Sequence, residues 1–106
     1  MINYEAFTQL DIKIGKIIAA EKITGTDKLL KLEIDLGTEK RTLVAGIAEM
    51  YQPQDLVGKE IPILVNLEPK RLKGIESNGM ILAADNNGKP VLLHPDTIVP
   101  AGSKVK

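Results

Sequence analysis

The sequence contains no cysteine and no tryptophan, and His94 is its only histidine. Without cysteine, disulfide frameworks and thiolate metal sites are excluded. A catalytic triad needs a histidine or a substitute within hydrogen-bond reach, but His94 lies before Pro95 in a turn-like segment, far in sequence from Ser77. The carboxylates are scattered singly among cations, and no glycine-rich phosphate motif is present. We therefore expect a domain that is not itself an enzyme and that uses no metal and no cofactor.

Aromatic residues are scarce, at 3% of the chain, and the net charge is zero because 14 Lys and Arg balance 14 Asp and Glu. A surface that reads RNA by stacking bases on rings needs more aromatic side chains than Tyr4, Phe7 and Tyr51 provide. A strong and indiscriminate nucleic-acid binder usually carries a basic excess. If this chain binds a nucleic acid, a local patch must read its shape and backbone more than its bases.

No apolar run is long enough to span a membrane, and Met1 leads into no signal-peptide pattern. Together with the absence of cysteine, this predicts a cytoplasmic protein without a membrane segment. The 106 residues are 43% hydrophobic and 26% charged, which is typical of one globular domain over residues 1–106. A domain of this size buries roughly two thirds of the surface that its unfolded chain exposes.

Residues 1–10 are typical of a short N-terminal helical segment. Asn3 can cap the helix, and Phe7 and Leu10 are three positions apart, so they share a face. Because scarce aromatic residues usually lie inside a protein, we expect this segment to cover one end of the core.

Most of the remaining chain shows the apolar and polar alternation of half-buried β-strands. In the first strand, residues 11–21, Ile12, Ile14 and Ile18 point to one face, and Gly15 indicates a bulge or a bend. Further elements are expected as strands over residues 30–36, 40–46, 59–67 and 80–84, a short helix over 53–57, a type I′ turn at Asn87-Gly88 with a returning strand at 91–93, and a tail with one short strand over 94–106.

Five strands with a short helix between the third and the fourth follow the order of an OB-fold. The predicted fold class is therefore all-β, an OB-fold five-stranded barrel with added elements at both termini. A glycine inside the first strand fits a small closed barrel, in which strands must bend sharply.

A basic, glycine-articulated loop is predicted over residues 66–82, between two apolar strands. Lys70, Arg71 and Lys73 offer charged donors for phosphates, and Arg71 can hold one in bidentate fashion. Neutral donors and one soft apolar contact are offered by Asn66, Ser77, Asn78 and Met80. The pattern alone leaves two alternatives open, because such a loop can simply be solvated and Met80 can belong to the core.

Several stretches along nearly the whole chain together resemble the tRNA-binding OB-fold family. They are residues 11–17, 25–32 and 46–47, then Asn66-Leu67-Glu68-Pro69-Lys70, Gly74-Ile75-Glu76-Ser77-Asn78-Gly79-Met80, Pro95-Asp96 and Pro100-Ala101-Gly102. That family includes the C-terminal (beta-type) domain of methionyl-tRNA synthetase, stand-alone structure-specific tRNA-binding proteins and synthetase-associated cytokine precursors. Residues 27–41 look closest to the synthetase domain. Thr24-Gly25-Thr26 is a departure, since many relatives have a His-Pro pair before Asp27.

The resemblance implies an OB barrel with added terminal elements that form a homodimer interface, and the C-terminal extension over residues 94–106 is the expected dimer contact. It implies tRNA binding by shape, with little base specificity, in support of the catalytic part of methionyl-tRNA synthetase in cis or in trans. The family motif carries the tRNA-contact role onto Asn66, Lys70, Ser77 and Met80, chemistry extends it to Arg71, Lys73 and Asn78, and Lys31 and Arg41 on the barrel face are further candidates.

Three functions stay open at this point. The chain can be a tRNA-binding and dimerising appendage or beta subunit of methionyl-tRNA synthetase, or a stand-alone tRNA-binding protein acting in trans. A third possibility, from another class, is a secretion-related peptide-binding chaperone of the same fold. An apolar groove in place of the basic loop would indicate the chaperone.

Overall fold

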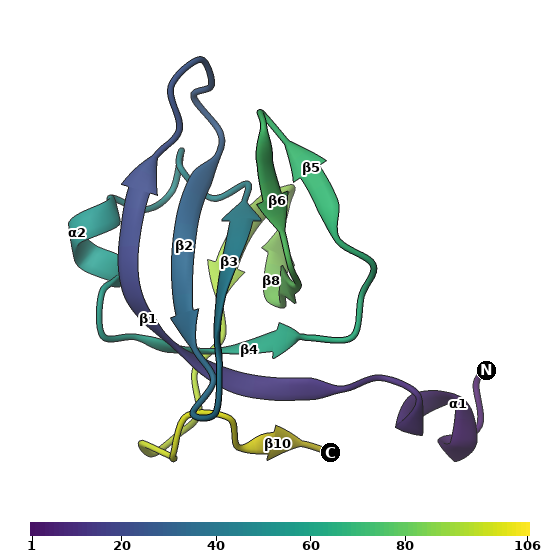
Figure 1. Cartoon of the computed structure of the whole chain (residues 1–106). Helices are drawn as coiled ribbons and strands as arrows, with labels where there is room; N and C mark the ends of the chain where they lie inside the picture. Colours follow the sequence, from purple (N-terminus) through teal and green to yellow (C-terminus); the bar gives the residue numbers. More distant parts are fainter.

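The computed structural model describes all 106 residues, and nearly all of its regular structure is antiparallel β-sheet (Figure 1). The main sheet has the strand order β3-β2-β1-β4-β7, with β10 also pairing with β1. Its strands are β1 (Ile12–Lys22), β2 (Leu30–Asp35), β3 (Lys40–Ala45), β4 (Glu60–Leu64), β7 (Met80–Ile81) and β10 (Lys104–Val105). Two hairpins form separate sheets, namely β5 (Lys70–Leu72) with β6 (Ile75–Ser77) and β8 (Ala83–Asn86) with β9 (Lys89–Leu92).

The main sheet curls into a barrel because β1 bends and serves two partners. Lys16 marks the overlap, since it lies opposite Asp35 of β2 and also opposite Glu60 of β4. The far edges meet where the Asn78 N–H donates to the Thr42 carbonyl at 2.9 Å. The short helix α2 (Pro53–Leu56) lies between β3 and β4 in the chain. The predicted all-β fold of OB type is thus confirmed.

The register irregularity in β1 lies at Ile18, so of the bulge or bend predicted at Gly15 the bulge is not at that residue, whereas the strand passes from one partner to the other at the neighbouring Lys16. The register between β1 and β2 shifts between Ile17 and Ala19, and the Ile18 side chain is left 38% exposed. Glycine is required at position 15 for a different reason. A Cβ placed there would lie 2.3 Å from Cγ2 of Ile34, which is too close for any other residue without a shift. Glycine thus allows close packing of two barrel strands, and the pairing irregularity falls three residues later.

The core is a single cluster of aliphatic side chains from every long strand and from α2. Its fully buried members include Ile17, Leu30, Leu32, Ile34, Leu43, Leu56, Ile61 and Ile63. Each such side chain contributes about 1.5–3 kcal/mol relative to an exposed one. Nearly continuous aliphatic packing explains how the barrel closes with so few aromatic residues.

The C-terminal segment packs on the outside of β1, over Ile12 and Ile14, which are buried outside the main cluster. The Ile14 N–H donates to the Ser103 carbonyl at 2.8 Å, and the Gly102 N–H donates to the Ile14 carbonyl at 2.7 Å. A Cβ on Gly102 would lie 2.3 Å from the Leu36 carbonyl oxygen. The predicted short final strand therefore forms as β10 and covers one apolar side of the barrel wall.

The N-terminal helix α1 (Tyr4–Thr8) forms as predicted, with the Asn3 side chain accepting from the Ala6 N–H at 2.9 Å. Its expected place over the core is wrong. Figure 1 shows that α1 extends away from the barrel beyond the N-terminal end of β1, and no residue of α1 is buried. Its apolar residues never reach the core because β1 carries the helix outward. No helix of the structure is long and apolar enough to cross a membrane.

Candidate nucleic-acid interface

The segment predicted as a loop is largely an ordered hairpin, formed by β5 and β6. Lys70 lies opposite Ser77 and Leu72 opposite Ile75, so Lys73 and Gly74 form a two-residue turn. Their φ angles are 50° and 79°, as a type I′ turn requires. A residue other than glycine is uncommon at such an angle. The turn places Lys73 at the tip of the hairpin, which rises at the same end of the barrel as the β1–β2 loop (Figure 1).

The cations of this hairpin face solvent. Lys70, Arg71 and Lys73 are exposed, and none lies within ion-pair distance of a carboxylate. One guanidinium nitrogen of Arg71, Nη1, donates to the Gly74 carbonyl at 2.8 Å, which supports the turn. Glu76 lies opposite Arg71 in the register, so residues 70–77 carry a net charge of +2. The hairpin is thus a local basic patch on a chain with no net charge.

Two residues predicted to contact RNA, the exposed Asn66 and the buried Ser77, form hydrogen bonds within the protein at the base of the hairpin. Asn66 bridges the entry to β1, with its amide donating to the Gln9 carbonyl at 2.7 Å and accepting from the Asp11 N–H at 2.8 Å. Ser77 is only 5% exposed, and its hydroxyl accepts from the Val44 N–H at 3.0 Å and donates to the Gly79 carbonyl at 3.2 Å. Both side chains position the hairpin, because their polar atoms are already bonded.

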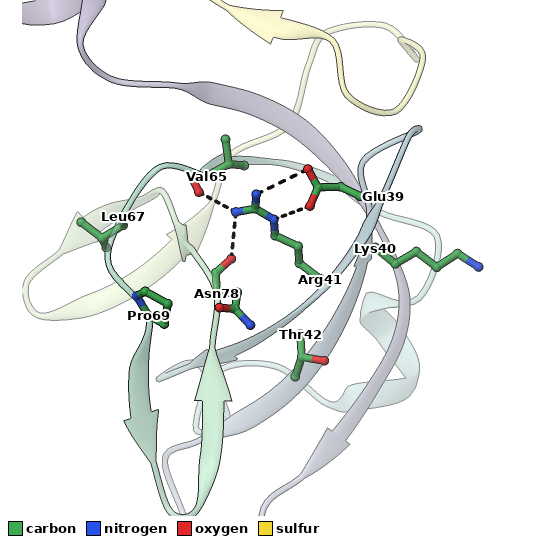
Figure 2. Close-up of a pocket in the computed structure, with 8 residues that line it drawn as sticks. All are labelled: Glu39, Lys40, Arg41, Thr42, Val65, Leu67, Pro69 and Asn78. Atoms are coloured by element: carbon green, nitrogen blue, oxygen red, sulfur yellow. Dashed lines mark hydrogen bonds and ion pairs between the residues drawn. The ribbon is translucent and has the colours of Figure 1, made fainter.

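Arg41 connects β3 to both ends of the segment that carries the hairpin (Figure 2). Its Nη1 donates to the Val65 carbonyl before the hairpin and, at 3.4 Å, to the Asn78 carbonyl after it. Its Nε donates to Glu39 at 2.8 Å, and this hydrogen bond is the main cause that lowers the pKa of the Glu39 carboxyl below its usual range. The Arg41 charge is therefore compensated by Glu39, and its donors are used within the protein.

The other predicted contact residues lie at different places on the surface. Met80 in β7 is 46% exposed, so it is available on the surface and is not a core residue. Lys31 in β2 pairs with Glu21 at 3.6 Å and is partly exposed. Asn78 follows β6 and lies at the pocket described next.

A pocket of about 550 Å³, called here the Asn78 pocket, lies between β3 and the segment that carries the hairpin (Figure 2). Sequence reasoning missed most of it, because its walls come from β3 and from the segments before β5 and after β6, which become neighbours only when the barrel closes. It is lined by Glu39, Lys40, Arg41, Thr42, Val65, Leu67, Pro69 and Asn78. In Figure 2 the Lys40 side chain points away from the other side chains.

An OB-type barrel that presents a basic hairpin at its rim is typical of oligonucleotide-binding domains. Comparison with known families makes the class specific, since the family model described as "Putative tRNA binding domain" matches residues 12–104. The chain belongs to this tRNA-binding domain family.

Relatives agree with this assignment. Methionine–tRNA ligase of Methanothrix thermoacetophila is 51% identical over 106 residues, which are all of this chain but 16% of that protein. The structure of a MetRS related protein from Pyrococcus horikoshii matches with a TM-score of 0.95 and 40% identity, over 100% of this chain and 98% of that one. The chaperone CsaA from Bacillus anthracis matches with a TM-score of 0.90 and 36% identity, over 100% and 99% of the two chains.

Proposed function

We propose that this chain is a non-catalytic tRNA-binding and dimerising domain that serves a methionyl-tRNA synthetase, as its appendage or its beta subunit. The similarity to methionine–tRNA ligase supports this pairing, and the chain spans about a sixth of the length of the curated relatives it matches. The catalytic part would act in cis or in trans, in the cytoplasm. Tethering raises the effective concentration of tRNA at that part without any new contact.

The observation that carries the proposal is the preformed basic hairpin. Its three cations have no carboxylate partner within ion-pair distance, and the turn at Lys73 and Gly74 holds them on a two-stranded ribbon. Phosphate contacts give affinity and orientation without reading sequence. With three cations and no aromatic ring on the hairpin, the domain is suited to the backbone of a folded RNA.

We assign the RNA-contact surface to exposed side chains at and near the hairpin that are not fixed by internal hydrogen bonds at its base. Lys70, Arg71 and Lys73 bind phosphates, and Met80 in β7 offers an exposed apolar contact. Lys31 lies on the barrel face as a further cation. Asn66, Ser77 and Arg41 act indirectly, because they fix the base of the hairpin through their internal hydrogen bonds.

A dimer is the second part of the proposal, and an apolar groove beside the C-terminal segment supports it. The groove has a volume of about 430 Å³ and includes Ile14, Pro62, Leu93 and Val105 in its lining. A second copy bound there would cover these side chains and present two hairpins to one tRNA. Light scattering on the purified chain should give a mass of about 23 kDa, twice the 11.5 kDa of one chain. A monomer at micromolar concentration would remove this part of the proposal.

A titration with folded tRNA and with an unstructured RNA of equal length, each at two salt concentrations, tests the tRNA function. We expect tighter binding of the folded RNA at both concentrations, because a fixed ribbon matches a fixed arrangement of phosphates. Equal binding of the two RNAs would count against recognition of shape.

The similarity to CsaA favours one alternative, a peptide-binding chaperone of the same fold. The apolar groove beside β10 would then hold peptide, and the hairpin cations would be dispensable. A stand-alone tRNA-binding protein acting in trans is a further alternative, supported by the MetRS related protein, of which this chain covers 98%. Separate binding measurements with tRNA and with an unfolded polypeptide distinguish the functions, because a chaperone binds the polypeptide and loses nothing when the hairpin cations are removed, whereas both tRNA-binding functions require those cations.

A further inference from the structure

The Asn78 pocket is placed where a nucleotide bound by the hairpin would reach. Pro69 lines the pocket and is followed directly by Lys70, the first cation of β5. Adjacent Cα atoms are only 3.8 Å apart. The pocket wall and the first hairpin cation are therefore neighbours along the chain, and one bound RNA strand can contact both. Its volume of about 550 Å³ is within the range of sites for small organic ligands.

The electrostatics of the pocket disfavour a phosphate inside it. Arg41 is the cation in its wall, and its guanidinium is already bonded to the Glu39 carboxylate and to two carbonyl oxygens. Lys40 points away from the other pocket side chains (Figure 2). The exposed Glu39 carboxylate would repel an anion. The pocket is thus suited to a neutral group that carries hydrogen-bond donors for Glu39.

Asn78 supplies the specific polar contacts of the pocket. Its backbone N–H donates to the Thr42 carbonyl and its backbone carbonyl accepts from Arg41, so the residue is firmly placed. Its side-chain amide extends from the strand toward Thr42 at the pocket (Figure 2). An amide offers one donor and one acceptor side by side, and Asn pairs in this way with N6 and N7 of adenine.

Apolar surface beside the amide completes the site. Leu67 is 46% exposed and Pro69 is also exposed, and both line the same pocket. A nucleobase has a flat face that packs on apolar surface and an edge that forms hydrogen bonds. A sugar or a phosphate has no comparable face.

We propose that the Asn78 pocket receives one unpaired base of the bound RNA, with adenine preferred. The base packs against Leu67 and Pro69, its N6 and N7 pair with the Asn78 amide, and the second hydrogen of the same N6 amino group donates to Glu39. This inference rests on the proposed tRNA function and adds one base-reading position to a domain that otherwise reads shape and phosphates.

The direct test follows the nuclear magnetic resonance signals of the isotope-labelled chain during two titrations. Adenosine monophosphate and ribose phosphate carry the same phosphate, but only the first carries a base. We expect the first to shift the side-chain amide signals of Asn78, and the second to shift only backbone signals of the hairpin. Identical shifts from the two ligands would overturn the pocket as a base site.

A second test uses tRNA and two pocket variants, Asn78→Ala and Leu67→Ala, with Asn87→Gly as the matched control. The control removes an exposed amide in a turn where glycine takes the same positive φ. Each pocket variant should weaken tRNA binding about tenfold without changing its salt dependence. Native circular dichroism of both pocket variants separates lost contact from lost fold.

The two proposals fail in different ways. If the unmodified chain does not bind tRNA, the proposed function is wrong and the base site falls with it. The unmodified chain can bind tRNA with the salt dependence expected for phosphate contacts at the hairpin cations. If both folded pocket variants then bind tRNA as tightly as the unmodified chain, only the base site is wrong.

Discussion

Arg41 should be a positioning residue. Its removal should lower the stability of the domain and leave the electrostatic contacts between the domain and RNA unchanged. Its Nη1 bonds the Val65 carbonyl and, at a long 3.4 Å, the Asn78 carbonyl, so it joins both ends of the hairpin segment to β3. A hydrogen bond from a charged donor contributes about 1.5–3 kcal/mol, and the carbonyl left without a partner adds a comparable penalty when buried. Pairing with the exposed Glu39 adds little, because solvent screens it.

We therefore expect Arg41→Ala to lower the free energy of unfolding by about 2–4 kcal/mol, against a total of roughly 5–15 kcal/mol for a domain. Urea denaturation followed by circular dichroism measures the loss. Arg41→Lys should recover only part of it, since an ammonium cannot reproduce the planar fork that reaches two carbonyls and a carboxylate.

The salt dependence of tRNA binding distinguishes positioning from contact. With Arg41→Ala the affinity should fall while the slope of log K against log salt stays unchanged, because no phosphate contact is removed. A loss of stability below about 0.5 kcal/mol together with a slope reduced by about one would instead make Arg41 a phosphate ligand.

Three further changes test the packing and the polar contacts. Gly15→Ala should destabilise the barrel by about 1–3 kcal/mol in a urea titration, because the new Cβ meets Ile34 Cγ2; an unchanged midpoint would contradict the close approach. Ser77→Ala should cost about 1–2 kcal/mol, because the Val44 N–H loses its acceptor, and it should leave the salt slope of tRNA binding unchanged. Because the pKa of Glu39 is lower in the folded than in the unfolded chain, its ionised carboxylate stabilises the native state above the unfolded pKa. This stabilisation is lost as the pH falls through the folded pKa. Because Glu39 is exposed and solvent screens its pairing with Arg41, Glu39→Gln should flatten the acid limb of a stability profile only slightly. A large change would contradict this view of the pair as a screened surface contact.

The fold was largely accessible from the sequence because alternation reports which strand faces are apolar. Residues 30–36 and 40–46 pair as predicted, and Asn87-Gly88 forms its tight turn, with both φ angles positive. Gly15 and Ile18 show where alternation stops being informative. A glycine required by close packing and a glycine required by a bulge look alike in one sequence, since the strand that approaches Gly15 is nineteen residues away.

The site was accessible only in part. The charges of Lys70, Arg71 and Lys73 can be read from the chain, and their exposure follows from their chemistry. The positions of Ser77 and Arg41 could not be read, because their partners Val44 and Val65 become neighbours only when the barrel closes. Polar residues at the ends of strands can be ligands or structural contacts, and tertiary hydrogen bonding decides between them.

If the hairpin carries the phosphate contacts, removal of its cations must change the salt dependence of tRNA binding more than removal of cations elsewhere on the barrel. Lys70→Gln with Lys73→Gln removes two hairpin cations, and Lys16→Gln with Lys59→Gln removes two cations elsewhere on β1 and before β4. The measurement is the slope of log K against log salt for tRNA, between about 50 and 200 mM salt. The slope should be smaller by about two for the hairpin pair and unchanged for the control pair. Equal slopes for the two pairs would contradict the assignment of the phosphate contacts to the hairpin.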